Sequence, residues 1–163
     1  MKKYIFLKVV MISLLLLSIF LLNGCSSQPT RYILDLTIAE NPPGLLIDPE
    51  NYAYIGGRIR AINNHDFNPL TGAMREYPTR TLRVPSGESL IALVHYQHQS
   101  STTVFFGFKF VSLPPLENGG SYILYLSNPP FGPSSFQDRH IKFLKLNQDS
   151  GIYENVLGVT FAD

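Results

Sequence analysis

The chain has 163 residues, of which 45% are hydrophobic, and this length suffices for one domain with a substantial core. Its formal net charge is +1, but three of its 13 Lys and Arg and none of its 12 Asp and Glu precede Cys25, which leaves the remainder weakly acidic. This remainder has no basic stripe to neutralise phosphates, so the composition excludes nucleic-acid binding. Cys25 is the single cysteine, which excludes a disulfide within the chain.

The first 24 residues have the pattern of an export signal. The basic stretch from Met1 to Lys8 is followed by an apolar run from Val9 to Leu22, interrupted only by Ser13 and Ser18. A helix that spans a membrane needs about 20 consecutive apolar residues, and this run is shorter. The pattern therefore predicts a signal peptide over residues 1–24.

The end of this segment, Leu22-Asn23-Gly24-Cys25, resembles the lipobox of bacterial lipoproteins. The resemblance implies a diacylglycerol on the Cys25 sulfur, cleavage before Cys25, and acylation of the new amino terminus with a fatty acid such as palmitate. Two or three chains together hold a protein stably on a membrane. Ser26, where an inner-membrane retention signal would have Asp, favours the periplasmic face of the outer membrane. A Gram-positive source, an ordinary cleaved signal and an uncleaved anchor remain alternatives.

Residues 25–31 are predicted to form a short tether, and residues 32–163 a single domain. The polar stretch from Ser26 to Thr30 spans little more than about 12 Å as a flexible chain. A domain on this tether lies close to the membrane surface.

The distribution of proline and glycine along the chain predicts an all-β domain. Pro and Gly occur in clusters between runs of aromatic and β-branched residues. We expect an antiparallel β-sandwich of about seven or eight strands, with a small, partly open barrel as the competing architecture. The repeated order of proline, glycine and apolar strand resembles transthyretin-like and carboxypeptidase-regulatory-like sandwich modules. The expected sandwich is therefore transthyretin-like or immunoglobulin-like. The predicted strands cover residues 32–38, 52–62, 80–84, 89–97, 104–111, 121–127, 141–146 and 152–161.

Three of these strands carry specific expectations. Gly56 and Gly57 within strand 52–62 indicate a bulge or a close backbone approach. Strand 89–97 is apolar on both faces and is expected to be buried on both. Strand 104–111 places Val104 and the three phenylalanines Phe106, Phe108 and Phe110 on one face, and we expect these rings to supply much of the core.

Two loops, over residues 63–79 and 128–138, are the predicted contact surface for a partner. Stretches this long without regular structure are often functional. The candidate contact residues are Phe67 and Leu70 in the first loop and Phe131 and Phe136 in the second. The alternative for Phe131 and Phe136 is that they fold back and close the core.

No catalytic site, metal site or cofactor is predicted. Asp138, His140 and the serines Ser86 and Ser89 lie outside any Gly-x-Ser-x-Gly elbow. His95 and His98 are three residues apart, so on a strand they point to opposite faces and do not chelate one ion. The protein is therefore not expected to be an enzyme.

The leading hypothesis is a structural or protein-interaction lipoprotein, held at the membrane through Cys25, with an envelope protein as partner. The alternative is a small-ligand or glycan-binding module that uses Tyr52, Tyr54, Tyr96 and the aromatic residues of the two loops. An apolar pocket between the sheets would favour the alternative. In size, lipobox, tether and predicted sandwich, the chain is also similar to the outer-membrane lipoprotein of type VI secretion systems.

Overall fold

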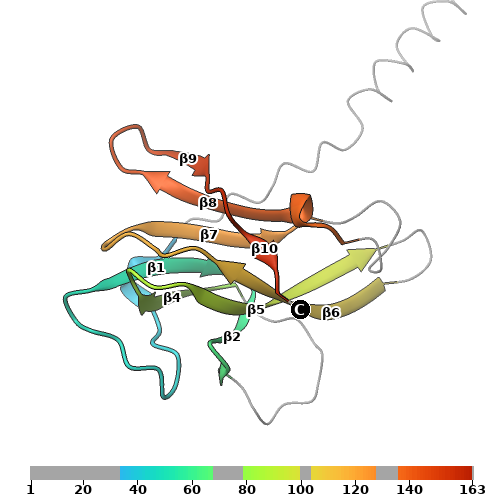
Figure 1. The fold of residues 1–163 in the computed structure, drawn as a ribbon, viewed down its shortest axis with the longest axis horizontal. Coiled ribbons are helices and arrows are strands. Elements are labelled where there is room, and N and C mark those ends of the chain that lie inside the picture. Colours follow the sequence, from blue (N-terminus) through green and yellow to red (C-terminus); the bar gives the residue numbers. More distant parts are fainter. Residues whose placement is uncertain (1–33, 68–78, 100–103, 128–135, 163) are drawn as a thin grey trace, which may run out of the picture. The chain divides into compact units, whose positions relative to one another are not determined.

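The computed structural model describes residues 34–67, 79–99, 104–127 and 136–162. Residues Tyr32–Asp163 form one compact unit, and the regular structure of its described residues is strand apart from two short 3-10 helices, which confirms the predicted all-β sandwich (Figure 1). The described residues contain ten strands, more than the predicted seven or eight. Their bounds are β1 Tyr52–Gly57, β2 Ile59–Ile62, β3 His65–Asp66, β4 Arg80–Pro85, β5 Leu90–Gln99, β6 Val104–Leu113, β7 Ser121–Leu126, β8 Ile141–Asn147, β9 Ile152–Asn155 and β10 Thr160–Phe161.

The strands form two five-stranded sheets. Sheet 1 has the order β4-β1-β7-β8-β9, and sheet 2 has the order β10-β6-β5-β2-β3. All strand pairs are antiparallel except β1 with β7, which is parallel. Among the described residues, no helix is long and apolar enough to cross a membrane.

The core lies between the two sheets and draws residues from both. A well-filled apolar interior of this kind must hold the domain together, because the chain forms no internal disulfide. The central strands contribute most of the side chains with almost no exposed surface. The buried core side chains include Ala53 and Ile55 of β1, Ile59 and Ile62 of β2, Leu82 and Val84 of the edge strand β4, Leu90, Ala92 and Val94 of β5, Val111 and Leu113 of β6, Leu124 of β7 and Phe143 of β8.

The predicted first strand, residues 32–38, is wrong where the structure describes it. Leu36–Ile38 form a 3-10 helix in which Leu36 and Ile38 are 45% and 64% exposed. The Asp35 carboxylate accepts hydrogen bonds from the Thr37 backbone N–H at 3.0 Å and from the Thr37 hydroxyl. Such local side-chain bonds compete with a strand ladder, and they override the apolar alternation here.

The predicted strand 52–62 is two strands in different sheets. The chain leaves sheet 1 at Gly57 and enters sheet 2 at Ile59. A Cβ at Gly57 would lie closer than 3.0 Å to the Leu124 carbonyl oxygen, so the predicted close backbone approach is confirmed. The strand bounds fail because a local pattern does not reveal a change of sheet.

Part of the predicted irregular stretch 63–79 is a β-hairpin. Asn63 and Asn64 have φ values of 47° and 65° and connect β2 to β3, where Ile62 pairs with His65. Two-residue hairpin turns need positive φ at both positions, and asparagine tolerates this conformation better than most residues. The hairpin was missed because neither turn position is glycine.

Two predictions about β5 and β6 are wrong: β5 is not buried on both faces, and the three phenylalanines of β6 that were predicted for the core do not point into it. Strand β5 is central, paired with β2 and β6, but only one of its faces is fully buried, because Ile91 is 44% exposed. Val111 pairs with the buried Ala92, so the odd-numbered residues of β6 face the core. The predicted core residues Val104, Phe106 and Phe110 therefore lie on the outer face and are 41%, 38% and 44% exposed, and Phe108 between them is only half-buried.

The predicted terminal hairpin is confirmed for β8 and β9, but the predicted strand 152–161 is divided into β9 and β10. Strands β8 and β9 pair across the turn, and the Asn147 side-chain oxygen accepts hydrogen bonds from the N–H groups of Asp149 and Ser150 at 3.0 and 3.2 Å. Beyond Asn155 the chain leaves sheet 1. Thr160–Phe161 form β10, which pairs with β6 at the edge of sheet 2.

Candidate functional site

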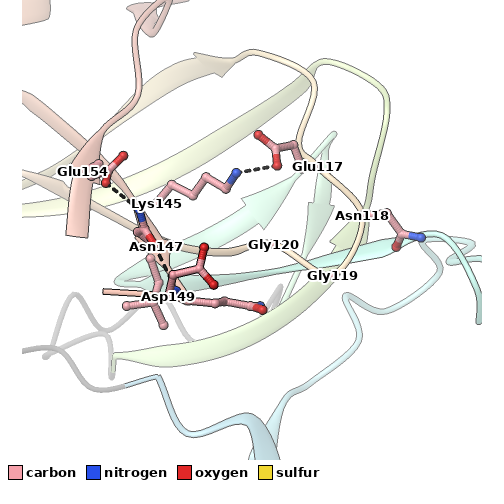
Figure 2. A pocket seen from close by; sticks show the side chains of 10 residues that line it. Glu117, Asn118, Gly119, Gly120, Lys145, Asn147, Asp149 and Glu154 are labelled. Carbon is pink, nitrogen blue, oxygen red and sulfur yellow. Dashed lines mark hydrogen bonds and ion pairs between the residues drawn. The ribbon is translucent and has the colours of Figure 1, made fainter. Parts of the chain in front are cut away.

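A polar hollow of about 530 Å³ opens beside the β8–β9 hairpin (Figure 2). Its walls come from two connections, the β6–β7 loop and the hairpin turn with the strand residues beside it. This volume falls within the range of small-molecule sites, but such sites are mostly apolar and this one is not. It is lined by Glu117, Asn118, Gly119, Gly120, Lys145, Leu146, Asn147, Gln148, Asp149 and Glu154.

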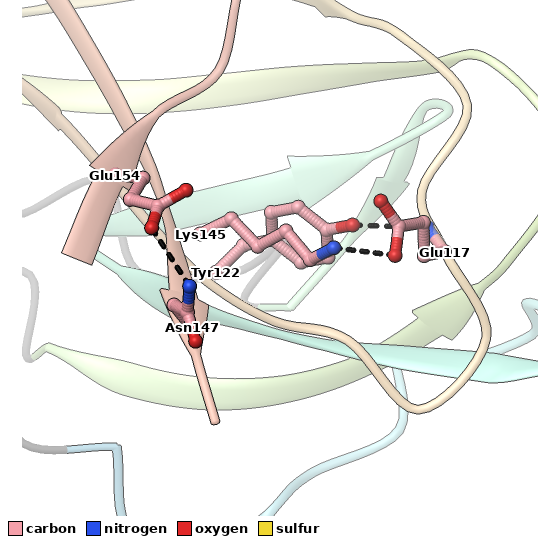
Figure 3. A network of polar contacts seen from close by, with 5 residues as sticks. All are labelled: Glu117, Tyr122, Lys145, Asn147 and Glu154. Atoms are coloured by element: carbon pink, nitrogen blue, oxygen red, sulfur yellow. Dashed lines mark hydrogen bonds and ion pairs between the residues drawn. The ribbon is translucent and has the colours of Figure 1, made fainter. Parts of the chain in front are cut away.

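Several polar side chains of the hollow bind one another or the neighbouring backbone. Lys145 donates to the Glu117 carboxylate, and Asn147 donates to Glu154 at 2.8 Å (Figure 3). The Tyr122 hydroxyl accepts a hydrogen bond from the Glu117 N–H at 2.9 Å, and its buried ring stacks on Phe143. The Lys145–Glu117 contact joins the β6–β7 loop to β8, the Tyr122 bond joins the same loop to β7, and the Asn147–Glu154 bond joins β8 to β9, so these contacts have a structural role.

The electrostatics of the hollow do not suit catalysis. The hydrogen bond to Glu117 raises the pKa of Lys145, which keeps the ammonium protonated. A lysine nucleophile or base needs a lowered pKa instead. Within the described residues, no group of three or more His, Cys, Asp and Glu side chains is placed to hold a metal ion. The hollow therefore offers polar contacts rather than an activated group.

We predict that Glu117→Gln changes the free energy of unfolding by less than about 1 kcal/mol, because partly exposed ion pairs contribute little. The Lys145 and Glu117 side chains are 33% and 71% exposed. Urea unfolding of the wild type and the variant at low and moderate salt measures the difference. A loss well above this size would show that the pair is a main support of the β6–β7 loop.

The predicted contact residues that the structure describes pack onto the domain. Phe67 is half-buried against the core, with the Arg80 guanidinium 5.0 Å from its ring centre. Phe136 lies 4.8 Å from Tyr96 and 5.8 Å from Phe161, measured between ring centres. Leu70 and Phe131 lie outside the described residues. Partner binding through the two loops stays a prediction.

The polar residues considered for catalysis have local structural partners. The His140 ring nitrogen accepts a hydrogen bond from the Gln137 N–H at 2.9 Å within the short 3-10 helix Asp138–His140. The Asp138 carboxylate accepts one from the Phe161 N–H at 2.8 Å, which fixes the end of β10.

Sequence reasoning missed an apolar surface on the outside of sheet 2. We call it the aromatic face, and it consists of Ile91 and Leu93 on β5 and Val104, Phe106, Phe108 and Phe110 on β6. Four of its side chains are between 38% and 44% exposed. The sequence signal was an excess of apolar residues, since both faces of β6 are apolar and only one can face the core. Contiguous exposed apolar patches mark interaction sites in soluble domains.

His95 is buried within the aromatic face. It retains only 4% exposure, and its ring lies 6.0 Å from Phe106 in a stacked arrangement and 5.4 Å from Phe108. The Arg60 guanidinium lies 5.1 Å from the Phe108 ring centre. Burial, and then the positive charge of Arg58, lower the pKa of His95 below its ordinary value. The histidine is therefore held neutral in this face.

We predict an acid-sensitive contribution of His95 to stability. The folded-state pKa is lowered, so the unfolded chain binds the proton more readily, and stability falls as the pH drops from about 6.5 towards the folded-state pKa. Each unit of depression corresponds to about 1.4 kcal/mol. Urea unfolding between pH 8 and pH 5 should show a smaller loss for His95→Gln than for the wild type. Parallel curves for the two proteins would contradict the prediction.

Comparisons with known proteins leave the site to be interpreted from its own geometry. No protein-family model matches the sequence, and neither a curated protein nor a solved structure matches it significantly.

Proposed function

We propose that the protein is a lipid-anchored lipoprotein of the cell envelope that binds an envelope protein through the aromatic face. The observation that carries this proposal is the exposure of Ile91, Val104, Phe106 and Phe110 on the outside of a regular sheet. Burying large apolar side chains of this kind contributes about 25 cal/mol for each Å² removed from water. A rigid sheet presents them without a cost for ordering a loop.

Two further observations support an interaction role over small-ligand binding. The space between the sheets is occupied by core side chains with almost no exposure. The hollow lined by Glu117 and Lys145 is polar and is bounded by a loop and a hairpin rather than by the two inner faces. It also contains none of Tyr52, Tyr54 and Tyr96, the tyrosines that the sequence-based ligand-binding hypothesis uses.

The proposed location is the periplasmic face of the outer membrane, with Cys25 as the lipidated residue. We predict that Cys25→Ala moves the protein from the membrane fraction to the soluble fraction and abolishes labelling by radioactive palmitate. Fractionation of cells that express the wild type or the variant measures both effects. A variant that stays in the membrane fraction and is still labelled would contradict lipidation at Cys25.

The partner is tested by crosslinking intact cells and isolating the lipidated protein. We expect Phe110→Lys to lower recovery of the partner about tenfold, which corresponds to losing about 1.4 kcal/mol of binding free energy. The matched control is Leu157→Lys, because Leu157 is 85% exposed and lies outside the aromatic face. Equal recovery with both variants would exclude the aromatic face as the binding surface. Recovery of secretion-system subunits would support the more specific role in type VI secretion.

The polar hollow supports the glycan- or small-ligand-binding module as a second candidate function. Its volume of about 530 Å³ accommodates a small polar molecule beside Asn118, Lys145 and Asp149. Native mass spectrometry of the purified protein distinguishes the two functions. A bound small molecule, together with the absence of any crosslinked protein, would favour the second candidate.

A further inference from the structure

One edge of sheet 2 is open. Strand β6 pairs with β5 along all ten of its residues, whereas β10 pairs with β6 only at Val111 and Ser112. Within the described part of the chain, no strand lies beside Val104–Gly107 on the side away from β5. An exposed strand edge is a template for pairing with another strand.

The direction of the backbone groups follows from one hydrogen bond. The Ala162 N–H donates to the Phe110 carbonyl oxygen at 3.0 Å, so the backbone groups of Phe110 point away from β5. In a strand, the N–H and C=O groups of alternate residues point to the same side. The groups of Val104 and Phe106 therefore point to the open edge.

The other sheet edges show the features that normally prevent such pairing. Beside β4, the Glu40 N–H donates to the Thr81 carbonyl oxygen and the Arg83 N–H donates to the Glu40 carbonyl oxygen, which covers that edge. Strand β3 is two residues long, with Asp66 paired to Arg60, and β9 carries Glu154. Short length, charge and cover are the usual protections of an edge.

The open edge of β6 lacks these protections. Val104–Gly107 contains neither a charged residue nor a proline. Val104, Phe105 and Phe106 are 41%, 44% and 38% exposed, so apolar side chains flank the open backbone on both faces of the sheet. An uncharged, aromatic edge of this kind favours association with another strand.

We propose that this edge pairs with the same edge of a second copy of the chain. Antiparallel pairing of a strand with itself is generated by a twofold axis, which is the commonest symmetry of protein dimers. The uncharged stretch then meets an uncharged stretch, so no like charges oppose each other. The result is one continuous sheet across both copies, with their aromatic faces on the same side.

The register of this pairing follows from the alternation of side chains. Directly opposite residues of antiparallel strands point to the same face, so the twofold axis passes at a residue and not between two residues. Centring the axis on Phe106 stays clear of the Phe110–Ala162 hydrogen bond. Phe106 then exchanges backbone hydrogen bonds with Phe106 of the second copy, and the two rings lie side by side on the aromatic face.

Crosslinking of the full chain in membranes tests the dimer. Cys25 is the single cysteine, so Phe106→Cys adds one new thiol on the proposed axis. Opposite Cβ atoms on paired strands are about 4.5–5.5 Å apart, which a short bismaleimide spans. We expect a product of twice the protein mass. The matched control is Ile152→Cys on β9, at the edge of sheet 1 and 63% exposed, and it should give no such product.

Two edge-blocking changes complete the test in the Phe106→Cys background. Val104→Pro removes an N–H that points away from β5, and proline is tolerated at such edge positions. Val104→Lys places a charge on the edge and keeps the N–H. Both should abolish the crosslinked dimer and leave resistance to proteolysis unchanged. Any one of four results would overturn the proposal. Phe106→Cys could give no dimer product, or Ile152→Cys could give an equal amount of it. The product could contain a protein of different mass, or the dimer product could persist in both edge-blocked chains.

Discussion

Replacing Gly57 with alanine is expected to destabilise the domain by about 3 kcal/mol or more. Gly57 ends β1 at a φ of 154°, and a Cβ there would lie closer than 3.0 Å to the Leu124 carbonyl oxygen. The obstacle is backbone of a central strand, so it does not move aside as a flexible side chain would. Urea unfolding measures the loss.

The matched control for Gly57→Ala is Gly87→Ala. Gly87 has a φ of 80°, but a Cβ there meets no atom within 4 Å. This variant carries only the cost of positive φ, about 1 kcal/mol. Similar losses for the two variants would show that backbone strain, and not the approach of Gly57 to β7, accounts for the effect.

Leu82→Ala is expected to lower the free energy of unfolding by about 2–5 kcal/mol. Leu82 is fully buried in β4 and pairs with Ile55, another fully buried residue. Truncation removes the transfer free energy of the side chain and leaves a cavity between the sheets. The midpoint of urea unfolding should fall without a change in the slope of free energy against urea concentration.

Leu157→Ala provides the reference for a leucine without packing partners. Leu157 is 85% exposed, and a surface substitution of this kind normally changes stability by less than about 0.5 kcal/mol. If Leu82→Ala were no more destabilising than Leu157→Ala, the interior between the sheets would have to be far less tightly packed than the buried side chains indicate.

The aromatic face and the open edge of β6 share Val104 and Phe106 but serve different contacts. In the two proposals, the face contacts a partner through side chains, whereas the edge pairs through backbone groups of Val104 and Phe106. Phe110→Lys tests the first contact and Val104→Pro the second, so the two proposals are tested separately. If the proposed anchor at Cys25 holds many copies in one membrane, it raises their effective concentration, and a modest edge contact is then enough for dimers to form.

Local sequence patterns were sufficient to predict the fold class and several structural details. Alternating apolar residues and clusters of proline and glycine are local signals, and they predicted the sandwich and most strands from Tyr52 onward. The Gly56-Gly57 pair correctly indicated a close backbone approach, since only glycine leaves room for it. The export signal and the candidate lipidation site at Cys25 are also sequence predictions, and these two rest on residues outside those that the structure describes.

Tertiary structure decided which faces and edges are available for function. Alternation groups Phe106, Phe108 and Phe110 on one face, but only the pairing of Val111 with Ala92 puts that face outside the core. Among the described strands, the sheet order likewise leaves part of β6 unpaired on one side, because β10 covers only two of its residues. Both features depend on contacts between segments far apart in the chain, and strand periodicity carries no information about such contacts.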